Sequence, residues 1–128
     1  MGHYKGGKAA DCPLSRIGVD LVEVKRIHEL LERYGDRFLQ RFFSPAEVSY
    51  ALAVPSPLRE ERLAARFAAK EAFIKALGKA VPLREVQVLK GERGAPSLEF
   101  RGKRYPVSLS HTRDLAVAVV LIPPGRSA

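Results

Sequence analysis

The chain has 128 residues, of which 46% are hydrophobic and 28% charged, proportions that fit one globular domain and exclude wholesale disorder. Lysine and arginine outnumber aspartate and glutamate by 22 to 14. The resulting charge of +8 favours a polyanionic partner, such as a nucleic acid, an anionic membrane, an acidic protein or a phosphorylated ligand. The single cysteine excludes an internal disulfide and a cysteine-rich metal site, so the cytoplasm is the expected location.

No segment is predicted to be a secretory signal or a membrane span. Residues 1–13 are polar and lack an apolar core, so they are expected to form a flexible extension. The longest apolar run, Leu115 to Ile122, is too short to cross a bilayer. Residues 14–124 are therefore expected to form a single domain, followed by a tail at 125–128.

The first predicted element is a strand over 15–23, in which Ile17, Val19 and Leu21 alternate and are expected to face the core. Asp20 would then point to the opposite side, close to the point where the chain enters a helix. Two roles are open for this carboxylate. It caps the helix, which is the commoner role, or it is a ligand in a site.

Three helical segments are predicted next. One runs from about Glu23 to Tyr34, with Ile27, Leu30, Leu31 and Tyr34 inward and Gly35 at its end, and a short one follows around Phe38 to Phe43. Ser44 to Glu47 form a capping box that opens a helix to about Ala53. On the first two helices, basic side chains interleave with aromatic ones. They form either a solvated face or a binding surface, and they are Lys25, Arg26, Arg33, Arg37 and Arg41.

The longest predicted helix covers 62–77, with Ser56 as its N-cap, Pro57 in its first turn and Gly78 as a left-handed stop. One face carries small and apolar residues together with Glu71 and Lys75. This spacing is typical of an exposed ion pair between residues i and i+4. Alanines beside the pair would also allow a ligand to come close.

After Gly78 the hydrophobic period changes from helical to alternating. Strands are predicted over 85–90, 97–101 and 105–109, then a polar turn over 110–114 and a more fully buried strand over 115–122. Helices followed by an antiparallel meander, with the early strand joining it, indicate an α+β fold. The long helix is expected to pack on an antiparallel sheet.

Two carboxylates in different elements, Asp20 and Glu71, could share one Mg²⁺, an ion that usually takes one or two protein carboxylates plus phosphate oxygens and water. Lys75, one turn beyond Glu71, could meet the same phosphate. Ser110, His111 and Thr112 offer hydroxyls and an imidazole to an anionic ligand, or they simply cap their own loop. Serine-hydrolase, Walker A, dinucleotide and zinc motifs are absent from the sequence.

Three segments resemble the signature blocks of holo-[acyl-carrier-protein] synthases, the small bacterial type of 4′-phosphopantetheinyl transferase. They are IGVDLVEVKRI at 17–27, RFAAKEAFIKALG at 66–78 and VSLSHT at 107–112. The resemblance extends from about Ile17 to Ile122. It departs from the family pattern at Lys79 and Ala80, where a threonine and a glycine are usual, and at Ala95, where a lysine is common.

The resemblance implies a 4′-phosphopantetheinyl transferase fold and an enzyme. Such enzymes move the phosphopantetheine arm of coenzyme A onto a serine of apo acyl carrier protein for fatty acid biosynthesis, and release adenosine 3′,5′-bisphosphate. The resemblance also implies Mg²⁺, and a homotrimer with active sites between subunits. No nucleic acid or membrane is expected as a partner.

The resemblance further assigns roles to residues. Asp20 and Glu71 match metal ligands, and Glu71 or a water on the metal would take the serine proton. Lys75 matches a lysine near the diphosphate. Residues matched to coenzyme A binding are Arg66, Lys75, Gly78, Ser110, His111 and Thr112, and those matched to the acidic carrier protein are Arg26, Arg33, Arg37 and Arg41.

Two other functions are compatible with the composition: a basic nucleic-acid-binding module, and a trimer that binds coenzyme A without transfer. An acidic pair at Asp20 and Glu71 would repel phosphates without a metal, which argues against the first. The presence of Asp20, Glu71 and Lys75 together argues against the second.

Overall fold

The computed structural model describes residues 14–125, so the expected extension at 1–13 and residues 126–128 of the tail lie outside the described part. The helices are α1 (Val24–Tyr34), α2 (Asp36–Phe42), α3 (Pro45–Leu52) and α4 (Leu58–Leu77). The strands are β1 (Arg16–Glu23), β2 (Val86–Lys90), β3 (Pro96–Phe100), β4 (Lys103–His111) and β5 (Leu115–Ile122). Short 3₁₀ turns lie at Leu83–Glu85 and Glu92–Gly94. The predicted α+β fold is confirmed.

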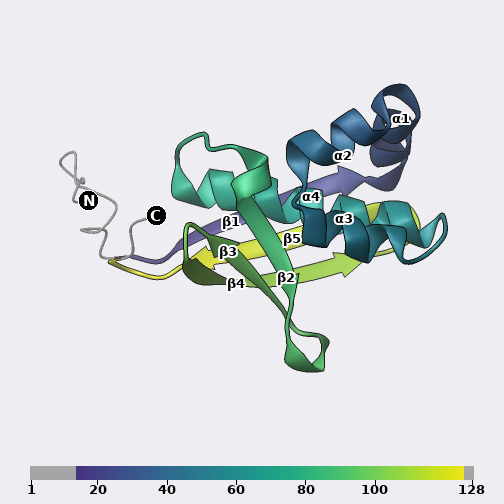
Figure 1. Cartoon of the computed structure of the whole chain (residues 1–128). Coiled ribbons are helices and arrows are strands. Elements are labelled where there is room, and N and C mark those ends of the chain that lie inside the picture. Colours follow the sequence, from purple (N-terminus) through teal and green to yellow (C-terminus); the bar gives the residue numbers. More distant parts are fainter. Residues whose placement is uncertain (1–13, 126–128) are drawn as a thin grey trace.

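The five strands form one antiparallel sheet in the order β1-β5-β4-β3-β2, so the first strand pairs with the last. Helix α4 lies across one face of this sheet, and α1, α2 and α3 gather around one end of it (Figure 1). The pairing places Asp20 opposite Ala118, and Ala118 opposite Leu109. The face of β1, β5 and β4 that contains these residues is the inner face, toward α4.

Helix α4 is the centre of the core. Its alanines at 64, 68 and 72 are fully buried, and their small side chains let the sheet come close on one side. Phe73 packs against the rings of Phe100 and Tyr105, with centroids 5.2 and 5.1 Å apart. Gly78 ends the helix with a left-handed φ of 80°, as predicted.

The start of α4 differs from the prediction. Pro57, and not Ser56, occupies the N-cap position, and no side chain caps the helix there. The Ser56 hydroxyl instead donates to the Glu60 carboxylate at 2.7 Å. The prediction of Ser56 as a cap is therefore wrong.

The orientation of β1 also differs from the prediction. Ile17, Val19 and Leu21 are 69%, 54% and 61% exposed, so the expectation that they face the core is wrong. Gly18 faces α4 instead, where a Cβ would lie 1.8 Å from the carbonyl oxygen of Ala72. Only glycine permits this approach of strand to helix, and the alternation then turns Asp20 to the same inner face.

Strand β5 is buried on one face only, against the prediction of a more fully buried strand. Its inner residues, Ala116, Ala118, Val120 and Ile122, are buried, whereas Leu115 and Val119 are 41% and 42% exposed. Val19 pairs directly with Val119 across the sheet. We call the set Ile17, Val19, Leu21, Leu115 and Val119 the apolar outer face.

The smaller helices follow their predicted boundaries closely. Gly35 separates α1 from α2, and Ile27 is fully buried, but Tyr34 is 41% exposed rather than inward. The capping box of α3 is confirmed, because the Ser44 and Glu47 side chains each accept the other residue's backbone N–H. Within residues 14–125, none of the helices combines the length and the apolar character needed to cross a bilayer.

Candidate active site

Asp20 contacts α4 through Lys75. Its Oδ1 accepts a hydrogen bond from the Lys75 ammonium at 2.8 Å, and the same ammonium donates to the carbonyl oxygen of Val19 at 3.1 Å. The N-cap of α1 is Glu23, so the helix-capping role left open for Asp20 is excluded. Lys75 therefore ties the helix to the strand at this carboxylate.

Glu71 lies one turn before Lys75 on the same face of α4, about 6 Å along the axis. Strand β1 runs antiparallel to this helix, since Arg16 donates to the carbonyl oxygen of Leu77 and Gly18 lies against Ala72. Asp20, two residues further along, therefore lies beside the middle of α4. The structure pairs Asp20 with Lys75 at the seam between β1 and α4, and Glu71 lies one helical turn before Lys75.

The oxygen donors at this seam suit a hard cation. They are the carboxylates of Asp20 and Glu71 and the carbonyl oxygen of Val19, and the Lys75 ammonium already occupies a cation position between two of them. Among the described residues, no group of three or more His, Cys, Asp or Glu side chains is placed to hold a metal ion, so the protein supplies at most two carboxylates. Such an incomplete set fits Mg²⁺, which retains water and binds phosphate oxygens.

The predicted polar turn after β4 is shorter than expected, because Ser110 and His111 belong to the strand itself. Thr112 starts the turn, and its Oγ1 accepts the backbone N–H groups of Asp114 and Leu115 at 3.2 and 3.1 Å. The hydroxyl of Thr112 thus caps its own loop. Ser110 is exposed, and the His111 side chain is 33% exposed.

His111 has a partner that the sequence did not indicate. Its Nδ1 lies 2.8 Å from Oε1 of Glu61 in the first half of α4. Glu61 and Glu71 are ten residues apart, or about 15 Å along a helix. Within one chain, the segment of His111 and the acidic pair therefore lie at different levels of α4, and the structure does not bring them together.

Arg66 is almost wholly buried, with 6% of its surface exposed, and its guanidinium lies 4.2 Å from the ring centroid of Tyr50. Arg62 contacts the same ring at 4.0 Å. Burial lowers the pKa of Arg66, an effect that the neighbouring Tyr50 opposes. Its Nε has no hydrogen-bond partner within the described part of the chain, so the group is an incompletely satisfied cation.

The four arginines matched to carrier binding are exposed on two neighbouring helices, with Arg26 and Arg33 on α1 and Arg37 and Arg41 on α2. We call them the basic helical surface. Arg33 and Arg37 lie over the ring of Tyr34, at 5.6 and 6.0 Å from its centroid.

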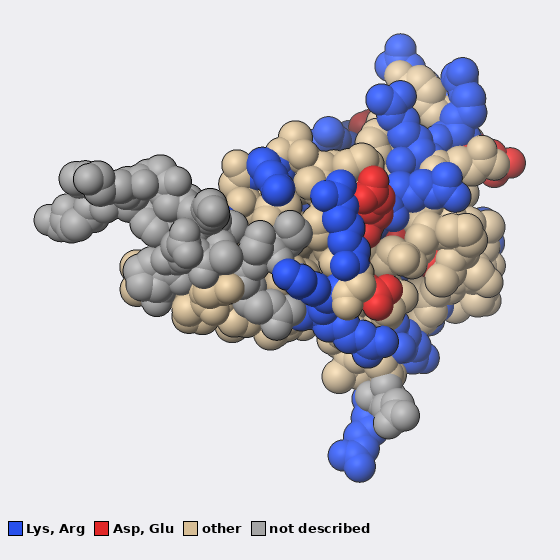
Figure 2. All heavy atoms as spheres, turned by 60° about the vertical axis from the view of Figure 1, so that its left-hand side comes forward, with Lys and Arg blue, Asp and Glu red and all other residues tan. Residues whose placement is uncertain are grey.

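A hollow of about 430 Å³ lies beside this surface, with an apolar floor and a basic rim. Its lining is formed by Leu30, Tyr34, Arg37, Phe38, Arg41 and Phe42. Figure 2 shows one face of the molecule, on which lysine and arginine side chains far outnumber acidic ones. An acidic helix with apolar contacts would fit such a hollow.

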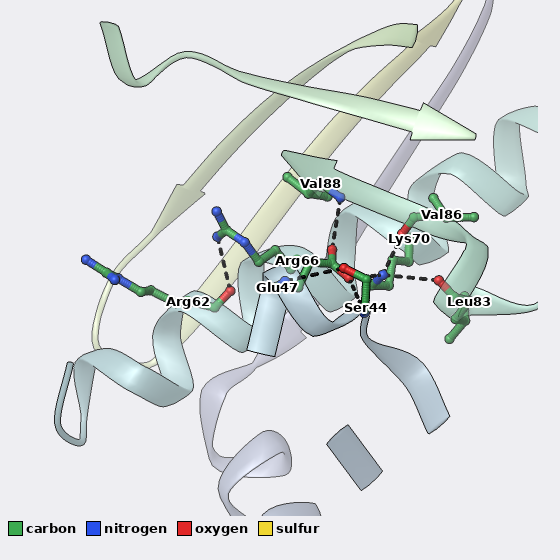
Figure 3. Close-up of polar contacts among 8 residues, drawn as sticks. All are labelled: Ser44, Glu47, Arg62, Arg66, Lys70, Leu83, Val86 and Val88. Carbon is green, nitrogen blue, oxygen red and sulfur yellow. Dashed lines mark hydrogen bonds and ion pairs between the residues drawn. The ribbon is translucent and has the colours of Figure 1, made fainter. Parts of the chain in front are cut away.

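A buried ion pair between Glu47 and Lys70 joins α3 to α4 (Figure 3). The Glu47 carboxylate is fully buried and accepts hydrogen bonds from the Lys70 ammonium at 2.7 Å and from the backbone N–H groups of Ser44 and Val88, each at 2.9 Å. These contacts connect α3, α4 and β2. The sequence assigned Glu47 to the capping box, which is confirmed, but gave no sign of its second role.

Lys70 donates its remaining hydrogens to the carbonyl oxygens of Leu83 and Val86. Desolvation lowers the pKa of the Lys70 ammonium, and the Glu47 carboxylate opposes that shift. Because Lys70 directly precedes Glu71, this network fixes the rotation of α4 at the acidic pair.

Comparison with known proteins places this geometry in a family. The sequence profile of the 4′-phosphopantetheinyl transferase superfamily matches residues 16–120. Proteins named holo-[acyl-carrier-protein] synthase are similar in sequence. The one from Gloeobacter violaceus is 42% identical over 85% of this chain and 92% of its own length, and the one from Halothermothrix orenii is 39% identical over 82% and 94%.

A solved structure agrees. The holo-(acyl-carrier-protein) synthase from Bacillus anthracis, determined in complex with coenzyme A (3′,5′-ADP), has a TM-score of 0.75 and 33% identity, covering 85% of this chain and 96% of that one. Profile, relatives and structure all cover most of the chain. The protein thus belongs to the 4′-phosphopantetheinyl transferase superfamily and, within it, to the holo-[acyl-carrier-protein] synthases.

Proposed function

We propose that this protein is a Mg²⁺-dependent holo-[acyl-carrier-protein] synthase of the cytoplasm. It transfers 4′-phosphopantetheine from coenzyme A to a serine of apo acyl carrier protein, for fatty acid biosynthesis, and releases adenosine 3′,5′-bisphosphate. Its family membership supports the transfer. The observation that supports the metal-dependent chemistry is the ion pair of Asp20 with Lys75 at the seam of β1 and α4, with Glu71 one turn before Lys75 on the same helix.

In this reaction the serine Oγ forms a bond to the phosphorus that bears the pantetheine, and the bond from that phosphorus to the nucleotide phosphate oxygen breaks. Positioning and charge neutralisation dominate the catalysis of such transfers. A Mg²⁺ held by Asp20 and Glu71 would supply charge neutralisation for the diphosphate. Glu71 is the carboxylate that takes the serine proton. The ammonium of Lys75 stabilises the leaving phosphate.

Residues of the nucleotide site are those that the family resemblance matches to coenzyme A binding, and their positions support this assignment. Arg66 presents a buried, incompletely satisfied guanidinium, as expected of a group that awaits an anion. Ser110, His111 and Thr112 lie at the exposed end of β4, and Gly78 ends α4 beyond Lys75. Within one chain the partner of His111, Glu61, lies about 15 Å along α4 from Glu71, so completing the site would require a second subunit.

The apolar outer face supports a homotrimer. Its large side chains are 41% to 69% exposed in the single chain, and contiguous apolar patches of this kind mark interfaces between proteins. Packing three copies through this face would bury it. The same packing would carry the His111 segment of one subunit toward the acidic pair of another.

Replacing Val19 at the centre of this face by aspartate should dissociate the trimer, because burying an unpaired carboxylate costs several kcal/mol. Light scattering during size-exclusion chromatography should give the molar mass of one chain for Val19→Asp and that of three chains for the wild type. Leu52→Asp is the matched control, since Leu52 is 43% exposed on α3, and it should remain trimeric. A wild type that elutes at one chain mass would refute the trimer.

Arg26→Glu should weaken the binding of the carrier protein and leave the binding of coenzyme A unchanged. Opposite charges on the basic helical surface and the acidic carrier speed their encounter, so charge reversal should raise the KM for the carrier about tenfold. The KM for coenzyme A should stay within about twofold, and the difference between variants should shrink at high salt. Arg101→Glu, at the turn after β3, is the control. A rise in the KM for coenzyme A alone would place docking elsewhere.

The experiment that tests the function combines the purified protein, coenzyme A, Mg²⁺ and an apo acyl carrier protein. Mass spectrometry should show the carrier gaining one phosphopantetheine, and a metal chelator should abolish the gain. An unmodified carrier after prolonged incubation would reject the transferase. Modification of the carrier that persists in excess chelator would reject only the dependence on Mg²⁺.

A further inference from the structure

The pair of Glu61 and His111 has no part in the transfer chemistry at the seam. It joins α4 to the end of β4 across fifty residues of sequence, with a 2.8 Å contact between Oε1 and Nδ1. The two side chains are only 14% and 33% exposed, so the contact is partly shielded from water. The Thr112 turn, closed by hydrogen bonds between Thr112 and Leu115, holds the backbone directly after His111.

This contact determines which nitrogen of His111 carries hydrogen. A carboxylate only accepts hydrogen bonds, so the hydrogen between the two groups sits on Nδ1. In the neutral ring Nε2 is then unprotonated, although the Nε2–H form is the commoner one for a free imidazole. Glu61 therefore selects the tautomer and restrains the ring, leaving Nε2 without a hydrogen as an acceptor.

We propose that Glu61 is a positioning residue for the transfer, which holds His111 in the Nδ1–H form and in one orientation toward the nucleotide end of coenzyme A. The inference rests on the proposed function, because His111 is assigned to that end of the substrate. Glu61 touches neither substrate nor reacting atoms and acts through the imidazole. Its loss is therefore felt in the affinity for coenzyme A and not in that for the carrier protein.

The tautomer can be observed without any turnover. In ¹⁵N-labelled protein titrated to neutral imidazole, the His111 signals, identified with His111→Asn, should show a protonated Nδ1 and an unprotonated Nε2. In Glu61→Leu, Nε2–H should become the major form. Glu61→Asp, which retains a carboxylate, should restore part of the Nδ1–H population. An unchanged His111 tautomer in Glu61→Leu would overturn the proposal.

Binding and kinetics supply the second readout. Calorimetry with coenzyme A alone should show about tenfold weaker binding for Glu61→Leu, the size of one lost hydrogen bond. The KM for the carrier should stay unchanged. Glu32→Leu is the matched control, because Glu32 and His28 form a similar pair on the exposed surface of α1, with the two atoms 3.3 Å apart.

The two failures are separable. If no carrier is ever modified, the proposed function fails, while the tautomer and the binding of coenzyme A still test Glu61. If transfer is normal but Glu61→Leu binds coenzyme A as tightly as the wild type, the positioning role is wrong and the function stands. Equal losses for coenzyme A and carrier would likewise reject positioning in favour of general destabilisation.

Discussion

Replacing Asp20 or Glu71 by alanine should lower the transfer rate by at least about a thousandfold while the chain stays folded. Each change removes one of the two carboxylates that would hold Mg²⁺ against the diphosphate, and Glu71→Ala also removes the proton acceptor. The loss of structure should be small, because the contact of Asp20 with Lys75 is largely exposed on the lysine side, and such pairs contribute about 0–1 kcal/mol. Rates of carrier modification and thermal unfolding, measured together, separate the two effects.

Two further variants sharpen this test. Asp20→Asn keeps the shape and a hydrogen-bond acceptor for Lys75 but removes the charge, so it should be nearly as inactive as Asp20→Ala. Glu85→Ala deletes an exposed acid that pairs with Arg101, far from the seam in sequence and on another element, and it should retain full activity. Near-normal rates for Asp20→Ala at saturating Mg²⁺ would show that the seam does not hold the metal.

The sequence predicted the order and type of the elements but not the side of β1 that faces α4. Alternation shows that Ile17, Val19 and Leu21 share a face, and nothing within one strand states whether that face meets a helix or another subunit. The decisive feature is Gly18, which lies against Ala72 where no larger residue fits. A glycine between two apolar residues does not by itself indicate a close contact between strand and helix. The orientation of β1 that Gly18 permits turns Asp20 toward Lys75.

In the candidate site, too, some residues could be proposed from the sequence and others could not. Asp20, Glu71 and Lys75 could be proposed because they fall in long signature segments, and the structure pairs Asp20 with Lys75, one helical turn beyond Glu71. Glu61 could not, since a glutamate in the first half of an amphipathic helix usually faces solvent. Its contact with His111 depends on how β4 passes over α4, a property of tertiary structure alone.

The buried pair of Glu47 and Lys70 escaped sequence reasoning for a related reason. The residues are 23 positions apart, and each lies in a helix where a charged side chain normally lies on the surface. Burial of both became visible only when α3, α4 and β2 were assembled around them. Pairs of this kind are tolerated when every polar atom has a partner, which makes the removal of one member costly.

Lys70→Met should therefore be strongly destabilising, lowering the free energy of unfolding by about 3–5 kcal/mol. Methionine has a similar length and fills the space, but it leaves the Glu47 carboxylate buried without its counter-ion and strips the carbonyl oxygens of Leu83 and Val86 of a donor. Urea denaturation followed by circular dichroism measures the loss. The isolated charge, rather than a cavity, is the expected cause.

The double variant Glu47→Gln with Lys70→Met tests that cause. A neutral glutamine removes the unpaired charge, and its one carbonyl oxygen can still accept from one of the backbone N–H groups of Ser44 and Val88, so the second change should recover part of the lost stability, with a coupling of about 0.5–3 kcal/mol. Lys90→Met, which removes an exposed lysine from the end of β2, should change the free energy of unfolding by less than about 0.5 kcal/mol. Additive losses in the double variant would mean that packing, and not the unpaired carboxylate, limits stability. Lys70 is next to Glu71 in sequence. If the double variant regains both stability and transfer activity, the ion pair acts only by supporting α4 and has no part in the chemistry at Glu71.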